Sequence, residues 1–308
     1  MPSLLLERLF SCMRYIKIIV GLFFLFCMAL LPLAVSQSFG RFLAKLMSWQ
    51  KHSRSYTVSK RNIDSCFPAL SAQDKKQLLK SSLEHTAMSY AEMGMSWLWP
   101  TSMSLAKVTS VKGEELLTAA VAQGRGVLII APHIGNWEVL NLFASNKYAI
   151  TVLYKQPKLK FFDWLINKMR KRLGGDMAPA NAAGVKKLIK KLRGNGVIAI
   201  LPDQEPVDGS GQFCSFFGHP AYTMTLLSQL ARKTSCKVIA GVALREPGGK
   251  GFAIEFSEVG TDINSSDLNI SLNVLNNTIE TIVTANPEQY QWEYKRFKKT
   301  PPGMAKFY

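Results

Sequence analysis

The residues best suited to chemistry lie directly after an apolar run. Residues 127–131 are Val, Leu, Ile, Ile and Ala; Pro132 and His133 follow, and Glu138 lies five residues after the histidine. Histidine changes its charge near neutral pH, and a carboxylate that holds the ring in one tautomer makes it a better general base. On one continuous helix, residues five apart point about 140° away from each other, but across a strand-to-helix turn they can converge. We therefore predict that Glu138 orients His133 for general-base catalysis.

A strand and a helix must hold this pair of side chains. The apolar run predicts a buried strand, which the proline ends. Gly135 and Asn136 supply turn chemistry, and Asn136 is predicted to be the N-cap of a helix that continues through Phe143. Glu138 then falls in the first helical turn, where the helix dipole stabilises its negative charge. In the alternative interpretation, Glu138 serves only the start of the helix and His133 is an unrelated loop residue.

The remainder of the chain alternates between predicted strands and helices. Strands are predicted over 149–154, 197–201, 237–244 and 251–259, and helices over 161–172, 182–192, 222–234 and 268–285. This alternation predicts an α/β sandwich with a mixed, largely parallel sheet. The strand over 197–201 ends in Pro202, Asp203 and Gln204, so a second polar cluster is expected at the edge where such sheets bind ligands. Residues 209–218 are predicted to be a loop, without the lysine of a phosphate-binding loop.

The charge balance and the N-terminal segment indicate acidic partners and a membrane. Lys and Arg number 38 against 21 Asp and Glu, a net charge of +17, which indicates phosphate groups, an anionic membrane, nucleic acid or an acidic protein. Residues 18–35 form an apolar run near the lower length for a bilayer-spanning helix. We predict an uncleaved membrane anchor over 1–40 and a catalytic domain over 41–308. The alternative is a cleaved signal peptide, because residues 34–36 resemble a cleavage site.

The five cysteines are scattered without metal-site spacing, which suits a reducing compartment and predicts no metal site.

A long helix is predicted from Ser71, which is an expected N-cap. Its His85 and Glu92 are interpreted as helical surface or core positions rather than as a site.

The helix over 161–172 has aromatic residues at one end and cations near the other. We predict an interfacial helix whose Arg170 and Arg172 meet a phosphate or a developing oxyanion. The alternative is an ordinary core-facing helix with a solvated basic end.

Four blocks, taken together, resemble the bacterial late lipid A acyltransferases, the lauroyl- and myristoyltransferases of lipopolysaccharide synthesis. The blocks are residues 133–138, 202–204, 216–221 and 286–298, and the resemblance extends from the N-terminal hydrophobic segment to Pro302. It implies a lysophospholipid-acyltransferase-like α/β domain, anchored on the cytoplasmic face of the inner membrane. It also implies transfer of a fatty acyl chain from acyl carrier protein to a hydroxyl of a Kdo-bearing lipid A precursor. The acyl carrier protein thioester is then the donor substrate, and no cofactor is expected.

The resemblance also carries roles to individual residues. It places catalytic roles on His133, Glu138, Arg170 and Asp203, and we assign substrate binding to Asn136, Arg172 and Gln204. Two stretches depart from the family pattern, at 154–157 and 205–207, and they leave the acceptor and the acyl chain length open.

The residues fit this chemistry independently of the resemblance. Acyl transfer from a thioester to an alcohol needs a base near neutrality and a donor for the oxyanion. Direct attack needs no nucleophilic residue, and no Ser lies in a Gly-x-Ser-x-Gly elbow. Basic helices would meet the phosphates of the precursor and the acidic carrier protein.

Two alternatives remain at this point. An acyltransferase of the same fold could act on another glycolipid or a glycerophospholipid. A basic, membrane-associated nucleic-acid binder would explain the charge but not His133 and Glu138. We expect no nucleic-acid partner.

Overall fold

The computed structural model describes residues 16, 18–48, 52–157 and 159–308. Its centre is a sheet in which the described strands follow the order β1-β9-β8-β2-β5-β3-β4. These strands are β1 (Val108–Lys112), β2 (Val127–Ile130), β3 (Thr151–Tyr154), β4 (Asp176–Pro179), β5 (Val197–Ile200), β8 (Lys237–Arg245) and β9 (Phe252–Glu258). The β8–β9 pair is antiparallel and the other pairs are parallel, which confirms the predicted mixed, largely parallel α/β sheet.

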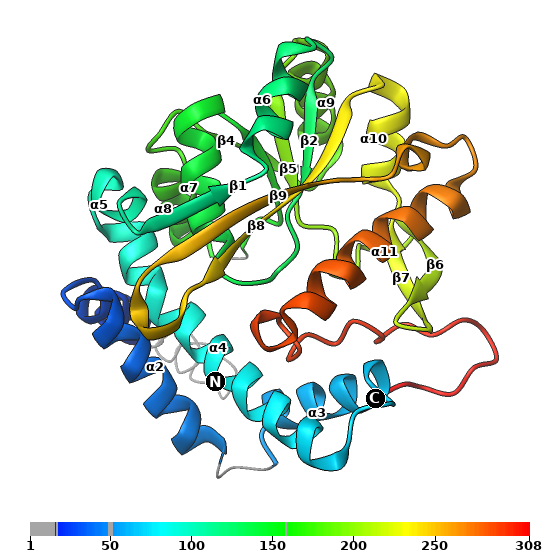
Figure 1. Ribbon diagram of the computed structural model, residues 1–308. Helices are drawn as coiled ribbons and strands as arrows, with labels where there is room; N and C mark the ends of the chain where they lie inside the picture. Colours follow the sequence, from blue (N-terminus) through cyan, green and yellow to red (C-terminus); the bar gives the residue numbers. More distant parts are fainter. Residues whose placement is uncertain (1–15, 17, 49–51, 158) are drawn as a thin grey trace, which may run out of the picture.

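Helices cover both faces of this sheet (Figure 1). The labelled α-helices of the chain are α2 (Leu33–Ser48), α3 (Arg54–Cys66), α4 (Ala72–Leu98), α5 (Thr101–Leu105), α6 (Glu114–Ala122), α7 (Trp137–Tyr148), α8 (Lys160–Arg170), α9 (Ala182–Arg193), α10 (Leu226–Thr234) and α11 (Leu268–Ala285). Helices α6 and α7 contribute to one buried apolar cluster, and α9, α10 and α11 contribute to the other. The sheet therefore separates two cores, as expected when amphipathic helices pack on both of its faces.

Strands β2 and β5 are adjacent, and every residue of both is buried. Apolar side chains on both faces explain why neither sequence alternates between polar and apolar residues. Because the two strands are parallel and Ile130 is paired with Ile200, the loops that follow them begin side by side. This register brings segments far apart in the sequence to one edge of the sheet.

The N-terminal apolar run is divided at Pro32. Residues 18–29 are helical, and α2 begins directly after the proline and packs along α4. Within the described part of the chain, no helix has both the length and the hydropathy that crossing a bilayer requires. Residues 1–15 and 17 of the predicted anchor lie outside the described residues. The two helices and the turn between them expose these apolar side chains: Ile19, Val20, Phe23, Phe26, Leu30, Val35, Phe39, Phe42 and Leu46.

The prediction of a loop over 209–218 was wrong. The chain forms a hairpin there, with β6 (Gly211–Phe216) paired to β7 (His219–Met224), and α10 begins at Leu226 rather than at 222. Its two-residue turn is Phe217 and Gly218, with φ of 49° and 75°. Two consecutive left-handed residues match the turn that suits the twist of a hairpin. The hairpin was not predicted from the sequence because the first turn residue is Phe217, where Asn or Asp is usual.

Candidate active site

The loops after β2 and β5 form the centre of the site. The Nδ1 atom of His133 lies 2.8 Å from Oδ1 of Asp203, and the His133 backbone N–H donates to Oδ2 at 2.9 Å. The Asp203 side chain is only 2% exposed. Burial raises the pKa of Asp203, but its contacts with His133 outweigh burial and leave that pKa below its ordinary value. An ionised Asp203 holds the Nδ1 proton, so Nε2 is left to accept a proton from a ligand.

Glu138 does not pair with His133, which corrects the predicted contact. Its carboxylate accepts from Nε of Arg170 at 3.0 and 3.1 Å and also from Nη2. Glu138 lies in the first turn of α7 and faces the end of α8, whereas Asp203 approaches His133 from the loop after the neighbouring parallel strand. Burial lowers the pKa of the Arg170 guanidinium, but the attraction of Glu138 outweighs it and raises that pKa above its ordinary value.

The turn between His133 and α7 requires glycine at one position. Gly135 has φ of 59°, and a Cβ there would lie 2.1 Å from the carbonyl oxygen of Ala243. One residue later, Asn136 donates its backbone N–H to that same oxygen at 2.8 Å. Its Oδ1 accepts from the Val139 N–H at 3.1 Å, which confirms the predicted N-cap. The turn is thus held tightly against β8.

Asn136 and Arg172, both assigned above to substrate binding, make contacts within the fold and do not line the cavity at His133. The Asn136 side chain is buried, and its Nδ2 donates to Glu92 at 2.9 Å. Arg172 donates to three backbone carbonyls, those of Met169, Trp99 and Ser96. Asn136 and Arg172 therefore use these donors to hold α4, α7 and α8 together.

A cavity of about 910 Å³ opens beside His133. The polar side chains that line it include His133, Glu138, Asn141, Arg170 and Gln204. Apolar residues also line it, among them Leu140 and Ala144 of α7, Ile129 and Val152 of the sheet, and Ile150 just before β3. Of the seven residues predicted for the site, the structure therefore brings His133, Glu138, Arg170 and Gln204 to the cavity, with Asp203 behind the histidine. The arrangement can position an apolar chain and a polar reacting group together.

Asn141 is a cavity residue that sequence reasoning missed. Its Nδ2 is buried and has no hydrogen-bond partner among the residues that the structure describes. It lies three residues after Glu138 on α7, and positions three apart share one face of a helix. That spacing is the signal by which it could have been found.

A second, more open groove of about 800 Å³ adjoins the cavity, because Tyr154 and Gln156 line both. Its charged lining consists of Lys160, Lys168, Lys171 and Asp163. Trp164 also lines it and is 54% exposed. The Nζ atom of Lys168 lies 4.9 Å from the centroid of the Trp164 ring. Lysines beside an exposed aromatic ring favour anionic groups at an apolar surface. Elsewhere among the described residues, no group of three or more His, Cys, Asp or Glu is arranged to hold a metal ion.

Comparison with known proteins places the chain in a family. Residues 6–299 match the family described as bacterial lipid A biosynthesis acyltransferase. The lipid A biosynthesis lauroyltransferase of Escherichia coli (strain K12) is 28% identical over 297 residues, which cover 96% of this chain and 95% of that protein. The palmitoleoyltransferase and the myristoyltransferase of lipid A biosynthesis from the same strain are 24% and 23% identical. Those two matches cover 83% and 87% of this chain, and 82% and 81% of the relatives.

Proposed function

Because the chain belongs to the bacterial lipid A biosynthesis acyltransferase family, we propose that it transfers a fatty acyl chain from acyl carrier protein to a hydroxyl of a Kdo-linked lipid A precursor. The observation that carries this proposal is His133, held by the buried Asp203 beside a partly apolar cavity. The acyl chain occupies the apolar part of the cavity. The thioester carbonyl then lies beside the histidine.

His133 is the general base in this mechanism. Asp203 holds Nδ1, and Nε2 takes the proton from the acceptor hydroxyl as its oxygen attacks the thioester carbonyl carbon. The tetrahedral intermediate collapses when the carbon–sulfur bond breaks, and the departing thiolate receives the proton from Nε2. The products are an ester and the free thiol of the carrier, and no covalent enzyme intermediate forms.

Arg170 stabilises the oxyanion of that intermediate. Glu138 engages its Nε and Nη2 groups, so the guanidinium is fixed in direction while Nη1 remains for the substrate. A preorganised donor needs no rearrangement as charge develops, which is why such groups contribute strongly to catalysis. In this mechanism, Glu138 is a positioning residue that acts through Arg170.

The lysines of the second groove provide a place for the phosphate of the acceptor. Lys160, Lys168 and Lys171 line the groove next to the catalytic cavity, so an acceptor could present its hydroxyl to His133 while its phosphate meets these cations. The basic surface also suits an acidic carrier protein.

We further propose that the protein acts at the cytoplasmic face of the inner membrane, where its donor and acceptor meet. Support comes from the exposed apolar residues of 18–29 and α2, together with Phe161 and Trp164 on α8. Aromatic and aliphatic side chains flanked by lysines are typical of helices that lie in a membrane interface. The proposal includes the predicted anchor over residues 1–40.

The experiment is an acyl-transfer assay with the purified full chain in mixed micelles. The donors are acyl carrier protein thioesters of several chain lengths, because the relatives are named for different acyl groups. The acceptors are the tetra-acylated Kdo-linked precursor, an unrelated glycolipid and a lysophospholipid, each followed by mass spectrometry. We expect the mass of one ester-linked chain to be added to the precursor. Acylation of the lysophospholipid or glycolipid instead would overturn the assignment of acceptor and favour the alternative substrate class.

A further inference from the structure

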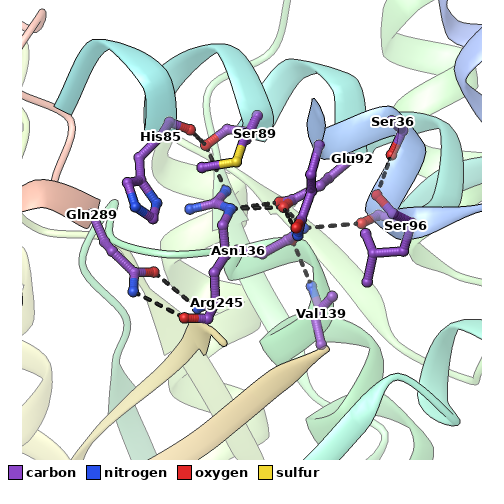
Figure 2. A network of polar contacts seen from close by, with 12 residues as sticks. Ser36, His85, Ser89, Glu92, Ser96, Asn136, Val139, Arg245 and Gln289 are labelled. Atoms are coloured by element: carbon purple, nitrogen blue, oxygen red, sulfur yellow. Dashed lines mark hydrogen bonds and ion pairs between the residues drawn. The ribbon is translucent and has the colours of Figure 1, made fainter. Parts of the chain in front are cut away.

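A buried polar network lies behind the turn between His133 and α7, residues 133–136, which we call the catalytic turn (Figure 2). At its centre Glu92 of α4 is fully buried, and Nε of Arg245, at the end of β8, donates to its two oxygens at 2.7 and 2.9 Å. Nη2 of Arg245 donates to the Ser89 hydroxyl at 2.7 Å. A buried ion pair is stable only when its geometry is good, because the attraction and hydrogen bonds between the partners must offset the cost of removing both charges from water.

Glu92 also holds the catalytic turn itself. Its Oε2 accepts from Nδ2 of Asn136, while Oδ1 of the same amide caps α7 at Val139 (Figure 2). If the Asn136 amide were flipped, its oxygen would face the Glu92 carboxylate and its NH2 group would face the Val139 N–H. The contact with Glu92 therefore fixes the orientation in which Oδ1 caps α7. Asn136 lies between His133 and Glu138, which places the network within three residues of each.

The N-terminal helix enters this network through Gln37. Its Nε2 donates to Oε1 of Glu92 at 2.8 Å, and the residue is 2% exposed. The same helix exposes Phe39 and Phe42. The buried side of α2 thus contacts Glu92, which holds the catalytic turn, while another part of the α2 surface is apolar and exposed.

We propose that Gln37 and Glu92 are positioning residues through which the packing of α2 on α4 sets the geometry of the catalytic turn. The chain of contacts runs from Gln37 through Glu92 to Asn136, and from there to the start of α7. A connected network of buried hydrogen bonds restricts its members to one arrangement. The helix that we propose to contact lipid is thereby tied to the reaction centre. The consequence for turnover rests on the proposed function, whereas the structural coupling does not.

The test is Gln37→Leu, which removes the donor and nearly preserves the volume. The matched control is Ser36→Ala in the same helix, because the buried Ser36 hydroxyl donates only within α2, to the Leu33 carbonyl. Two quantities are measured in the full chain, the kinetic constants and hydrogen–deuterium exchange by mass spectrometry. We expect Gln37→Leu to lower kcat by about tenfold to a hundredfold with KM nearly unchanged, because misplaced reacting groups lose rate rather than binding. Exchange should rise in the peptide over 134–142, and Ser36→Ala should change neither quantity.

Gln37→Met, which keeps the side-chain length, replaces the first variant if that one does not fold. The proposal is overturned if exchange rises only within 33–48, or if the kinetic constants match those of Ser36→Ala. A wild-type chain that transfers no acyl group would refute the proposed function, while the exchange measurement would still decide the coupling.

Discussion

At the scale of single residues, the site contains two carboxylates with separate tasks. Asp203 contacts the imidazole of His133, and Glu138 contacts the guanidinium of Arg170. The first contact determines which ring nitrogen can take a proton, and the second determines where a donor points. Removing either carboxylate should therefore impair a different part of the reaction.

Arg170→Lys should reduce turnover by roughly a hundredfold or more. A lysine keeps the charge but cannot both engage Glu138 along two N–H groups and present a third to the oxyanion, and loss of such a donor typically costs about 2.7–4 kcal/mol. The measurement is kcat in the acyl-transfer assay. The control is Arg193→Lys, the same exchange at an exposed position of α9, which should leave kcat unchanged. Equal, small effects at both positions would make Arg170 an ion-pair residue with no part in the chemistry.

The sequence supports the choice of His133 better than the choice of its partner. A histidine after a buried strand is visible in the chain, and so is Asp203 at the end of another strand. Which carboxylate reaches the ring depends on β2 and β5 being neighbours, and Asp203 lies 70 residues from His133. Strand order arises from the packing of the whole sheet, so local spacing favoured the nearer Glu138.

At the scale of elements, the lysines of α8 should contribute to binding rather than to rate. Lys160→Gln with Lys168→Gln removes two charges from the groove, and KM for a phosphorylated acceptor should rise at least fivefold with kcat nearly unchanged. The matched control, Lys186→Gln with Lys190→Gln on α9, removes two charges outside that groove and should leave KM unchanged. The comparison acceptor lacks the phosphate. The same rise in KM for both acceptors would show that the groove does not recognise phosphate.

Helix α2 should contribute directly to membrane binding. Phe39→Ser with Phe42→Ser removes two exposed aromatic rings, and vesicle partitioning should weaken at least tenfold, because each ring that enters an apolar phase contributes about 1.5–3 kcal/mol when fully buried. Sedimentation with anionic vesicles measures the partitioning. Ile270→Ser with Met304→Ser, at exposed apolar positions of other segments, serves as control. Unchanged partitioning of the α2 variant would exclude this helix as the contact surface.

Elements with strong local signals could be predicted closely. The helix predicted over 268–285 has those bounds in α11, and Ser71 and Asn136 are the N-caps expected of them. The hairpin of β6 and β7 could not be predicted, because Phe217 in its turn has a conformation that phenylalanine rarely adopts. Tertiary contacts hold that turn, as when the Phe217 N–H donates to Glu280 on α11 at 2.8 Å.

At the scale of the whole molecule, His85 should make stability depend on pH. Burial, followed by the charges of Arg245 and Arg41, lowers the pKa of His85 from 6.5 to about 3. The folded state therefore binds fewer protons than the unfolded state below pH 6.5, and the free energy of unfolding must fall as the pH falls. Between pH 6.5 and 5 this contributes roughly 1 kcal/mol, allowing for the partial exposure of the ring. Denaturant unfolding of wild type and His85→Gln should show a flatter pH dependence for the variant, and parallel curves would contradict the assignment.

The fold class was predictable because alternation of strands and helices extends over most of the chain. The network around Glu92 was not, because a buried glutamate in a helix has the same local pattern as an exposed one. The partner that makes Glu92 half of a buried ion pair is Arg245, 153 residues away on β8. Long-range pairs of this kind are set by the assembled sheet and its helices.

The central claim is that His133 is the base and that Asp203 orients it. It is tested most directly by measuring kcat for His133→Ala, Asp203→Asn and the double variant in the acyl-transfer assay. Asn keeps the shape of the side chain but can stabilise the wrong ring tautomer, so each single variant should lose about 10²–10⁴-fold in kcat. Because the two residues act as one unit, the double variant should fall little below His133→Ala. An Asp203→Asn variant with nearly wild-type kcat, or losses that multiply in the double variant, would contradict the claim.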